Sequence, residues 1–277
     1  MQTRIIDGRK IKDEILEEVK AKVLTLPFVP VFCDILVGDD KVSAQYVRIK
    51  AQAAESVGIK FRTAQFRESI TTEELIEEIE ALNHVPHMCG VIVQLPLPSH
   101  INKETVLDTI KPEIDVDCLA FKSSENFYNN GEGLSYPTAL ACIKILDSIN
   151  IDLNNKKIVV LGQGNLVGKP VTHLLRTRGF SVTTIDSKTE NADSLLKEAD
   201  VIISGIGQGK FLTGSMIKEG AVVVDAGTSE DNGAVVGDVD LESVKNIASF
   251  VSPTPGGVGP VTVAILLKNV LVVAQNK

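Results

Sequence analysis

The sequence has no tryptophan, and aromatic residues make up only 4 % of its 277 positions. Basic residues are also in the minority, because 28 Lys and Arg stand against 36 Asp and Glu, which gives a formal net charge of −8. Proteins that bind nucleic acids need clustered Lys and Arg to neutralise phosphates. Because the sequence has no basic run and no basic residues interleaved with aromatic ones, we expect no nucleic-acid partner.

Long apolar runs are absent as well. Residues 1–15 alternate charged and apolar side chains and contain no apolar core of the length found in signal peptides. No uninterrupted apolar run reaches the roughly 18 residues that would cross a bilayer. We therefore expect a cytoplasmic protein with no membrane association.

Cysteine and histidine are too sparse to indicate a disulfide framework or a metal site. The four cysteines stand far apart and form no C-x-x-C pair, which favours free buried thiols in a reducing compartment. Of the four histidines, only His84 and His87 are neighbours, and no cluster of acids or cysteines completes a ligand set. We predict no metal.

Hydrophobic periodicity alternates between helix and strand along the chain, which predicts an α/β fold with parallel sheets in two domains meeting near residue 138. The strands are expected at 28–38, 61–66, 89–94, 156–162, 181–186, 201–207, 221–227 and 248–253. The helices are expected at 11–23, 43–57, 71–82, 102–110, 138–148, 167–178, 192–199, 215–218, 241–244 and 260–274. Residues 111–137 lose periodicity, which is typical of a long functional loop or a domain boundary.

A glycine-rich turn follows the apolar strand at 156–162 and opens the next helix. Glycines in such a turn allow backbone N–H groups to approach a pyrophosphate at a helix N-terminus. Asp186 ends the following strand, where an acid would bind a ribose hydroxyl. This context favours a Rossmann-like dinucleotide domain; the alternative is that the glycines serve only tight packing. The turn comprises Gly162, Gln163, Gly164, Val167 and Gly168.

Polar residues that could carry chemistry also stand in the first half of the sequence. Tyr46 and Lys50 are four residues apart and share one face of a predicted helix, where a lysine can act as an acid or base if a cavity favours its neutral form. Gln94 ends a buried strand, the position where α/β folds place ligand contacts. Asp115 and Asp117 lie in the aperiodic segment. Each has an ordinary alternative: a solvated helix face, a turn residue and solvent-facing acids.

The C-terminal segment 252–262 contains three prolines and three glycines in eleven residues, directly before a predicted helix. Such a composition fixes one backbone path, which a simple linker would not need. This segment is typical of a loop held rigid against a ligand.

Together, these motifs resemble the bifunctional methylenetetrahydrofolate dehydrogenase/methenyltetrahydrofolate cyclohydrolase family over nearly the whole chain. The resemblance is carried by VGDDKVSAQYVRIKAQAAESVGI, GVIVQLPLP, PEIDVD, LVGKP, VVGDVD and TPGGVGPVT. It implies a catalytic, folate-binding domain of residues 1–138 plus 256–277 and a dinucleotide domain of residues 139–255, with folate between them. It also implies a homodimer.

The resemblance further implies an enzyme of one-carbon metabolism and purine biosynthesis. This enzyme oxidises 5,10-methylenetetrahydrofolate with NADP or NAD and hydrolyses the methenyl product to 10-formyltetrahydrofolate. Lys50 corresponds to the catalytic lysine, Tyr46 to the tyrosine one turn earlier, Gln94 to the residue that orients Lys50, and Asp117 to the acceptor for the pterin. The implied substrate contacts also include Pro255, Gly256, Gly257 and Thr262. The implied cofactor contacts add Asp186, Ser187, Lys188 and Thr228 to the glycine turn.

The sequence departs from the family pattern at three places. Gly162-Gln163-Gly164 replaces the usual Gly-Arg-Ser, and the missing arginine together with Asp186 favours NAD, although Ser187 and Lys188 could still bind a 2′-phosphate. Cys118 replaces a glycine, and 136–139 reads Tyr-Pro-Thr-Ala where Pro-Cys-Thr-Pro is usual. The alternatives are a cyclohydrolase with weak or lost dehydrogenase activity, a different dinucleotide enzyme of the shikimate dehydrogenase type, or a non-catalytic binding protein.

Overall fold

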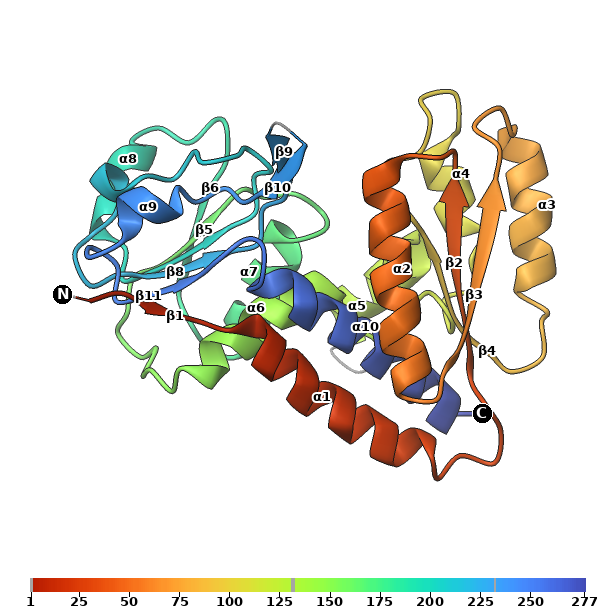
Figure 1. Ribbon diagram of the computed structural model, residues 1–277. Helices are drawn as coiled ribbons and strands as arrows, with labels where there is room; N and C mark the ends of the chain where they lie inside the picture. Colours follow the sequence, from red (N-terminus) through yellow and green to blue (C-terminus); the bar gives the residue numbers. More distant parts are fainter. Residues whose placement is uncertain (1, 131–132, 232) are drawn as a thin grey trace. The chain divides into compact units, whose positions relative to one another are not determined.

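The computed structural model describes residues 2–130, 133–231 and 233–277, and the chain divides into two compact units. Unit 1 comprises Met1–Asp13 and Thr138–Thr262, and unit 2 comprises Glu14–Pro137 and Val263–Lys277. All three divisions between the units fall within helices: α1 (Gly8–Val23), α10 (Val258–Gln275) and the first residue pair of α6 (Pro137–Ser148) (Figure 1). Each unit has its own parallel sheet, so the predicted α/β class is confirmed.

Unit 2 is built on a three-stranded parallel sheet in the order β3-β2-β4. The strands are β2 (Val31–Val37), β3 (Lys60–Phe66) and β4 (Met88–Val93). Every residue of β2 and β4 is buried, as near-continuous apolar runs predict for strands covered on both faces. The helices of this unit are α2 (Lys41–Ser56), α3 (Thr72–Leu82), α4 (Lys103–Asp108) and α5 (Phe121–Asn130). In Figure 1, α2 and α3 flank the strands.

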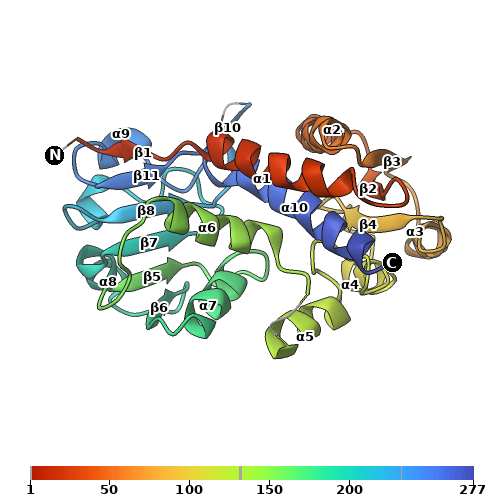
Figure 2. The ribbon, with the colours of Figure 1, turned by 90° about the horizontal axis from the view of Figure 1, so that it is seen from below.

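Unit 1 contains a six-stranded parallel sheet in the order β1-β11-β8-β7-β5-β6 (Figure 2). The strands are β1 (Arg4–Ile5), β5 (Ile158–Leu161), β6 (Val182–Ile185), β7 (Val201–Ser204), β8 (Val222–Asp225) and β11 (Phe250–Ser252). The helices are α6 (Pro137–Ser148), α7 (Gly168–Thr177), α8 (Ala192–Glu198), α9 (Leu241–Val244) and a 3₁₀ turn, η1 (Gly214–Met216). The chain moves from β5 to β6 on one side and then to β7 on the other. This reversal makes the carboxyl end of β5 a topological switch point, where α/β sheets bind ligands.

Residues 111–137, expected to be a long loop or a domain boundary, end where the chain passes from unit 2 to unit 1 between Pro137 and Thr138. They are not one continuous loop, because α5 forms among them. Its start is fixed by distant side chains: the Asp108 carboxylate accepts the Phe121 N–H at 2.6 Å, and Asp115 accepts the Ala120 N–H at 2.8 Å. Its sequence is mostly polar, and among residues 121–129 only Ser123 and Phe127 are buried. Local periodicity does not reveal a helix whose start depends on tertiary partners.

Two further elements differ from the expectation. β9 (Ser229–Asp231) and β10 (Ala234–Val236) form an antiparallel pair beyond the predicted strands. β1 pairs with β11, with Arg4 opposite Phe250, so the segment before Glu14 groups with Thr138–Thr262 in unit 1 rather than with residues 14–137. At the C-terminal end, the chain returns to unit 2 at Val263, whereas the predicted catalytic domain resumes at residue 256. The functional division into domains remains a prediction.

α10 is long and apolar enough to cross a membrane by length and composition. Counting only uninterrupted apolar residues missed this property, because Lys268 and Asn269 interrupt the helix without lowering its average hydropathy far. Of its 18 residues, 67 % are buried within the protein, which is typical of a core helix.

Candidate functional site

Lys50 lies at the centre of a polar cluster in unit 2. Its Nζ atom is 2.6 Å from the Asp34 carboxylate and 2.8 Å from Gln94 Oε1. α2 supplies Lys50, the middle of β2 supplies Asp34, and Gln94 directly follows β4. Gln94 is held at this edge because its N–H donates to the Ile35 carbonyl at 2.8 Å. The structure thus brings Lys50 and Gln94 together, as predicted, and adds Asp34.

Burial controls the electrostatics of this cluster. Asp34 has no exposed surface and the Lys50 side chain is 10 % exposed. Removal from water raises the pKa of Asp34, while the Lys50 ammonium acts in the opposite direction. Apart from this ion pair, neither carboxylate oxygen of Asp34 has a hydrogen-bond partner among the described residues. The proton affinity of this carboxylate therefore depends on Lys50.

Asp117 is positioned by a segment that extends the sheet of unit 2. The Val91 N–H donates to the Ile114 carbonyl at 2.8 Å, and Asp115 pairs with Val91 in a parallel bridge beside β4. Asn269 of α10 donates to the carbonyl of Val116 at 2.8 Å. Desolvation raises the pKa of Asp117 to about 7, against the opposing effect of Lys50. Asp117 can therefore switch between an acceptor and a neutral acid near neutral pH.

Tyr46 and Cys118 complete the sequence-predicted features of unit 2. Tyr46 is half-buried one turn before Lys50 on α2. Cys118 is fully buried with a φ of 59°, in the left-handed region that glycine adopts readily and other residues adopt at a cost. The cysteine thus occupies a glycine-type backbone position directly after Asp117.

The glycine turn of unit 1 lies at the switch point and is closely packed. Gly162 has a φ of +91°, and its N–H donates to the Ile185 carbonyl at 2.8 Å. A Cβ on Gly168 would lie 1.8 Å from the Gly162 carbonyl oxygen. Val167, the N-cap of α7, makes no side-chain capping hydrogen bond. Among the first residues of α7, the Lys169 N–H donates to the Gly164 carbonyl at 3.1 Å and Pro170 has no N–H, so a pyrophosphate would meet the backbone of the glycine turn rather than a full set of helix amides.

The remaining predicted cofactor residues lie mainly at exposed positions around this turn. Gln163 bends back, donating to its neighbour's carbonyl at 2.9 Å and to Thr172 Oγ1 at 3.3 Å, so its amide is occupied within the turn. Asp186 follows β6 and accepts the Lys188 N–H and the Thr189 hydroxyl, each at 2.9 Å. These hydrogen bonds lower the pKa of Asp186. The exposed members of the set are Gly164, Asp186, Ser187, Lys188 and Thr228.

Two buried acids that sequence analysis did not select shape the loops beyond β7 and β8. Asp238 accepts the N–H groups of Ile206 and Gln208, each at 2.8 Å. Asp225 accepts the N–H groups of Asp238 and Val239 at 3.0 and 3.1 Å, and desolvation raises the pKa of Asp225 to about 7. These carboxylates fix both loops, and the loop after β7 packs against the glycine turn, because a Cβ on Gly162 would lie 2.8 Å from the Gly205 carbonyl oxygen.

The constrained C-terminal segment adopts a tight turn in unit 1. The Gly257 N–H donates to the Pro253 carbonyl at 2.7 Å, and the Gly8 N–H donates to the Gly256 carbonyl at 3.0 Å. Pro255 and Thr262 also belong to this unit, whereas the Lys50 cluster belongs to unit 2. The segment thus follows a hydrogen-bonded turn, and its rigidity and its contact with substrate stay predictions.

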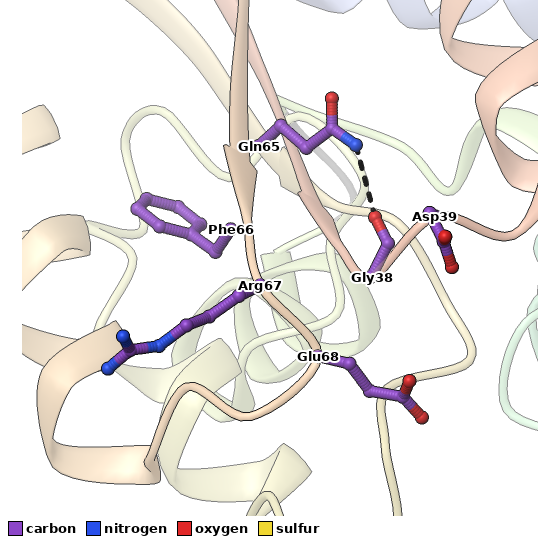
Figure 3. A pocket seen from close by; sticks show the side chains of 6 residues that line it. All are labelled: Gly38, Asp39, Gln65, Phe66, Arg67 and Glu68. Atoms are coloured by element: carbon purple, nitrogen blue, oxygen red, sulfur yellow. Dashed lines mark hydrogen bonds between the residues drawn. The ribbon is translucent and has the colours of Figure 1, made fainter.

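A hollow of about 390 Å³ at the carboxyl ends of β2 and β3 contains none of the Lys50 cluster (Figure 3). It is lined by Gly38, Asp39, Gln65, Phe66, Arg67 and Glu68. Within the described residues, no group of three or more His, Cys, Asp or Glu side chains is placed to hold a metal.

Asp34 is the member of the Lys50 cluster that sequence reasoning missed. The available signal was a single carboxylate in the otherwise apolar stretch VFCDILV. A charged residue is rarely fully buried unless it is paired. The partner, however, is supplied from another element and could not be identified by spacing.

Comparison with known proteins gives the same assignment for both halves. Residues 6–117 match the tetrahydrofolate dehydrogenase/cyclohydrolase catalytic-domain model, and residues 136–277 match the NAD(P)-binding-domain model of that family. The bifunctional protein FolD of Desulforamulus reducens is 39 % identical over 272 residues, which cover 97 % of this chain and 96 % of the relative.

Solved structures of other proteins match this chain over nearly its full length. The bifunctional FolD enzyme of Campylobacter jejuni matches with a TM-score of 0.93 and 38 % identity, covering 99 % of each chain. The Trypanosoma brucei FolD, complexed with NADP and an inhibitor, matches with a TM-score of 0.93 and 34 % identity, covering 100 % of this chain and 98 % of the other. The resemblance drawn from the motifs is confirmed: the chain belongs to the tetrahydrofolate dehydrogenase/cyclohydrolase family.

Proposed function

We propose that this protein oxidises 5,10-methylenetetrahydrofolate with NAD(P)⁺ and hydrolyses the resulting methenyl cation to 10-formyltetrahydrofolate. The observation that carries the proposal is the buried contact of Lys50 with Gln94 and Asp34, because it provides a proton-transfer group inside unit 2. Proton transfer by a positioned side chain contributes typically 10²–10⁴-fold to a rate.

The dinucleotide fits the described residues of unit 1. The N-terminus of α7 and the Gly162–Gly168 turn would hold the pyrophosphate, and Asp186 would accept hydrogen bonds from the ribose. When bound, the nicotinamide supplies the hydride acceptor. For this step the chain aligns the rings, since the folate nitrogens stabilise the cation that forms.

In hydrolysis, Lys50 is the group that accepts and donates protons. Water attacks the methenyl carbon, and its proton passes to the neutral amine of Lys50. Lys50 then gives a proton to the ring nitrogen as the carbon–nitrogen bond breaks. The positive charge of the substrate favours the neutral amine, because like charges repel. Gln94 orients Lys50, and Asp117 and Tyr46 bind the pterin. Further proposed substrate contacts are Pro255, Gly256, Gly257 and Thr262.

NAD is the preferred cofactor in this proposal. The pKa of Asp186 is held low by hydrogen bonds from Lys188 and Thr189, so the carboxylate stays charged and repels a 2′-phosphate. Gln163 is folded into its own turn and presents no cation there. Lys188 and Ser187 are exposed beside Asp186 and are the groups that would oppose this preference.

The decisive experiment measures both reactions in one preparation. Formation of methenyl absorbance from methylenetetrahydrofolate is followed with NAD and NADP in parallel, and loss of that absorbance reports hydrolysis. We expect both activities, with the higher kcat/KM for NAD. The Lys50→Met variant should lose hydrolysis and retain cofactor binding; unchanged hydrolysis would refute the role of Lys50.

A cyclohydrolase with weak or absent dehydrogenase activity is the second candidate, and the departure at Gln163-Gly164 favours it. Normal hydrolysis without methenyl formation with either cofactor would select it.

The proposal also includes that the protein forms a homodimer and acts in the cytoplasm. All four cysteines are free and buried, as suits a reducing compartment, and light scattering of the purified protein would test the dimer.

A further inference from the structure

The charge of Asp34 needs an explanation beyond stability. β2 is the central strand of its sheet, all seven of its residues are buried, and Asp34 is 0 % exposed. A buried ion pair is generally no more stabilising than apolar residues of similar volume, because both charges lose their hydration. An apolar side chain would therefore suit this position at least as well, which points to a chemical role.

The geometry links Asp34 to the proton on Lys50. An ammonium has three N–H donors, and at Lys50 one faces Gln94 Oε1 at 2.8 Å and another faces the Asp34 carboxylate at 2.6 Å. The amide oxygen of Gln94 does not take up a proton near neutral pH, whereas a carboxylate does. Because the Lys50 side chain is only 10 % exposed, Asp34 is the most direct proton acceptor in the cluster.

We propose that Asp34 acts through Lys50 as a positioning residue. It receives the proton that Lys50 gives up when the cationic substrate binds. One Nζ–H bond breaks and one O–H bond forms on Asp34, so the ion pair becomes a neutral pair without loss of a proton to solvent. This inference rests on the proposed cyclohydrolase function. Desolvation supports it by raising the pKa of Asp34.

The proton balance of the reaction is then complete. The neutral amine of Lys50 accepts a proton as water adds to the methenyl carbon. It passes that proton to the ring nitrogen as the carbon–nitrogen bond breaks, and takes up the hydroxyl proton as the formyl carbonyl forms. Lys50 ends as an ammonium and Asp34 as a neutral acid. Asp34 then releases the one proton that hydrolysis of the cation produces.

Other charged or polar groups near the pair come from several elements. Asp117 follows the segment beside β4 and couples electrically to both Lys50 and Asp34. Tyr46 lies one turn before Lys50, and β3 places Arg62 in register with Cys33, the neighbour of Asp34. Because Asp117 acts on substrate binding in the proposed function, its titration affects kcat/KM, whereas kcat at saturating substrate reports the Lys50–Asp34 pair.

The test compares kcat for methenyl hydrolysis as a function of pH in the wild type and in Asp34→Asn. In the wild type, internal transfer predicts a flat profile between about pH 6 and 9. In Asp34→Asn the proton must go to solvent, so kcat should fall by up to about tenfold per pH unit toward the acidic end of the profile and recover as the pH rises. The fall is expected at acidic rather than neutral pH, because loss of the carboxylate charge by itself favours the neutral amine. The dehydrogenase kcat should stay within about twofold, because hydride transfer needs no base from this pair.

Asp115→Asn is the matched control, because Asp115 is 1 % exposed and contacts Ala120 and Ser123 rather than Lys50. Any loss in this variant should be equal for both activities and independent of pH.

Two results for Asp34→Asn would overturn the inference: a wild-type pH profile of hydrolysis, or an equal loss of hydrolysis and dehydrogenase activity. If Asp34→Asn does not fold, the wild-type profile decides: a rise of about tenfold per pH unit contradicts internal transfer. Hydrolysis by Lys50→Met would instead refute the proposed function itself.

Discussion

A Cβ on Gly168 would lie 1.8 Å from the carbonyl oxygen of Gly162, so the two glycines hold the start of α7 directly against the end of β5. A side chain at position 168 cannot be accommodated without moving the turn. The same turn is the proposed pyrophosphate site. Its packing therefore sets the position of the amides that would contact the cofactor.

Gly168→Ala should displace this turn and raise the KM for the dinucleotide by at least about tenfold, with an overpacking cost of about 1–3 kcal/mol in stability. Gly214→Ala is the control, because a Cβ there would lie 2.1 Å from the Ser243 carbonyl oxygen and overpack the same unit outside the proposed cofactor site. Hydrolysis of the methenyl substrate by Gly168→Ala should persist, because the Lys50 cluster belongs to the other unit. Equal cofactor KM values for the two variants would contradict the assignment of the turn.

Asp186 should determine the choice between NAD and NADP. Asp186→Ser removes the charge that repels a 2′-phosphate, and we expect the ratio of kcat/KM for NADP to that for NAD to rise about 10- to 30-fold, equivalent to about 1.4–2 kcal/mol. Asp193→Ser removes an exposed acid from the first turn of α8 and serves as the charge-matched control. An unchanged ratio in Asp186→Ser would assign the selectivity to other groups.

Substrate binding should depend on the ionisation of Asp117. Burial raises the pKa of this carboxyl to about 7, so it becomes protonated as the pH falls below that value and loses acceptor strength for the pterin. At saturating cofactor, kcat/KM for methylenetetrahydrofolate should therefore decrease below about pH 7 by up to tenfold per unit. Asp117→Asn should have a lower kcat/KM with no such decrease. A wild-type profile that is flat through this range would count against Asp117 as the titrating acceptor.

The Lys50–Asp34 pair should show strong coupling in stability. Lys50→Met or Asp34→Val alone leaves an unpaired buried charge and should lower the free energy of unfolding by about 3–5 kcal/mol, whereas the double variant should be close to the wild type. Urea denaturation of the four proteins measures the coupling. Additive losses would show that the two residues contribute independently.

Much of the fold follows from local sequence. The apolar stretches around β2, β4, β5 and β7 predict buried parallel strands, because a strand covered on both faces needs no polar alternation. The glycine turn after β5 and the acid after β6 are close in sequence to the elements they terminate. These features indicated the Rossmann-like half and its proposed cofactor residues without any long-range information.

The sequence by itself determined the family and the parallel α/β class, and it selected Lys50, Gln94, Asp117 and the glycine turn as candidate site residues. Tertiary structure alone decided what surrounds them, because those contacts join residues distant in the chain. The Lys50–Gln94 hydrogen bond spans 44 positions, the start of α5 depends on Asp108, and β1 pairs with β11 at the other end of the chain. Asp34 illustrates the difference. Its carboxyl group is visible in the sequence, but its ion pair depends on Lys50, whose Nζ atom the fold places 2.6 Å away.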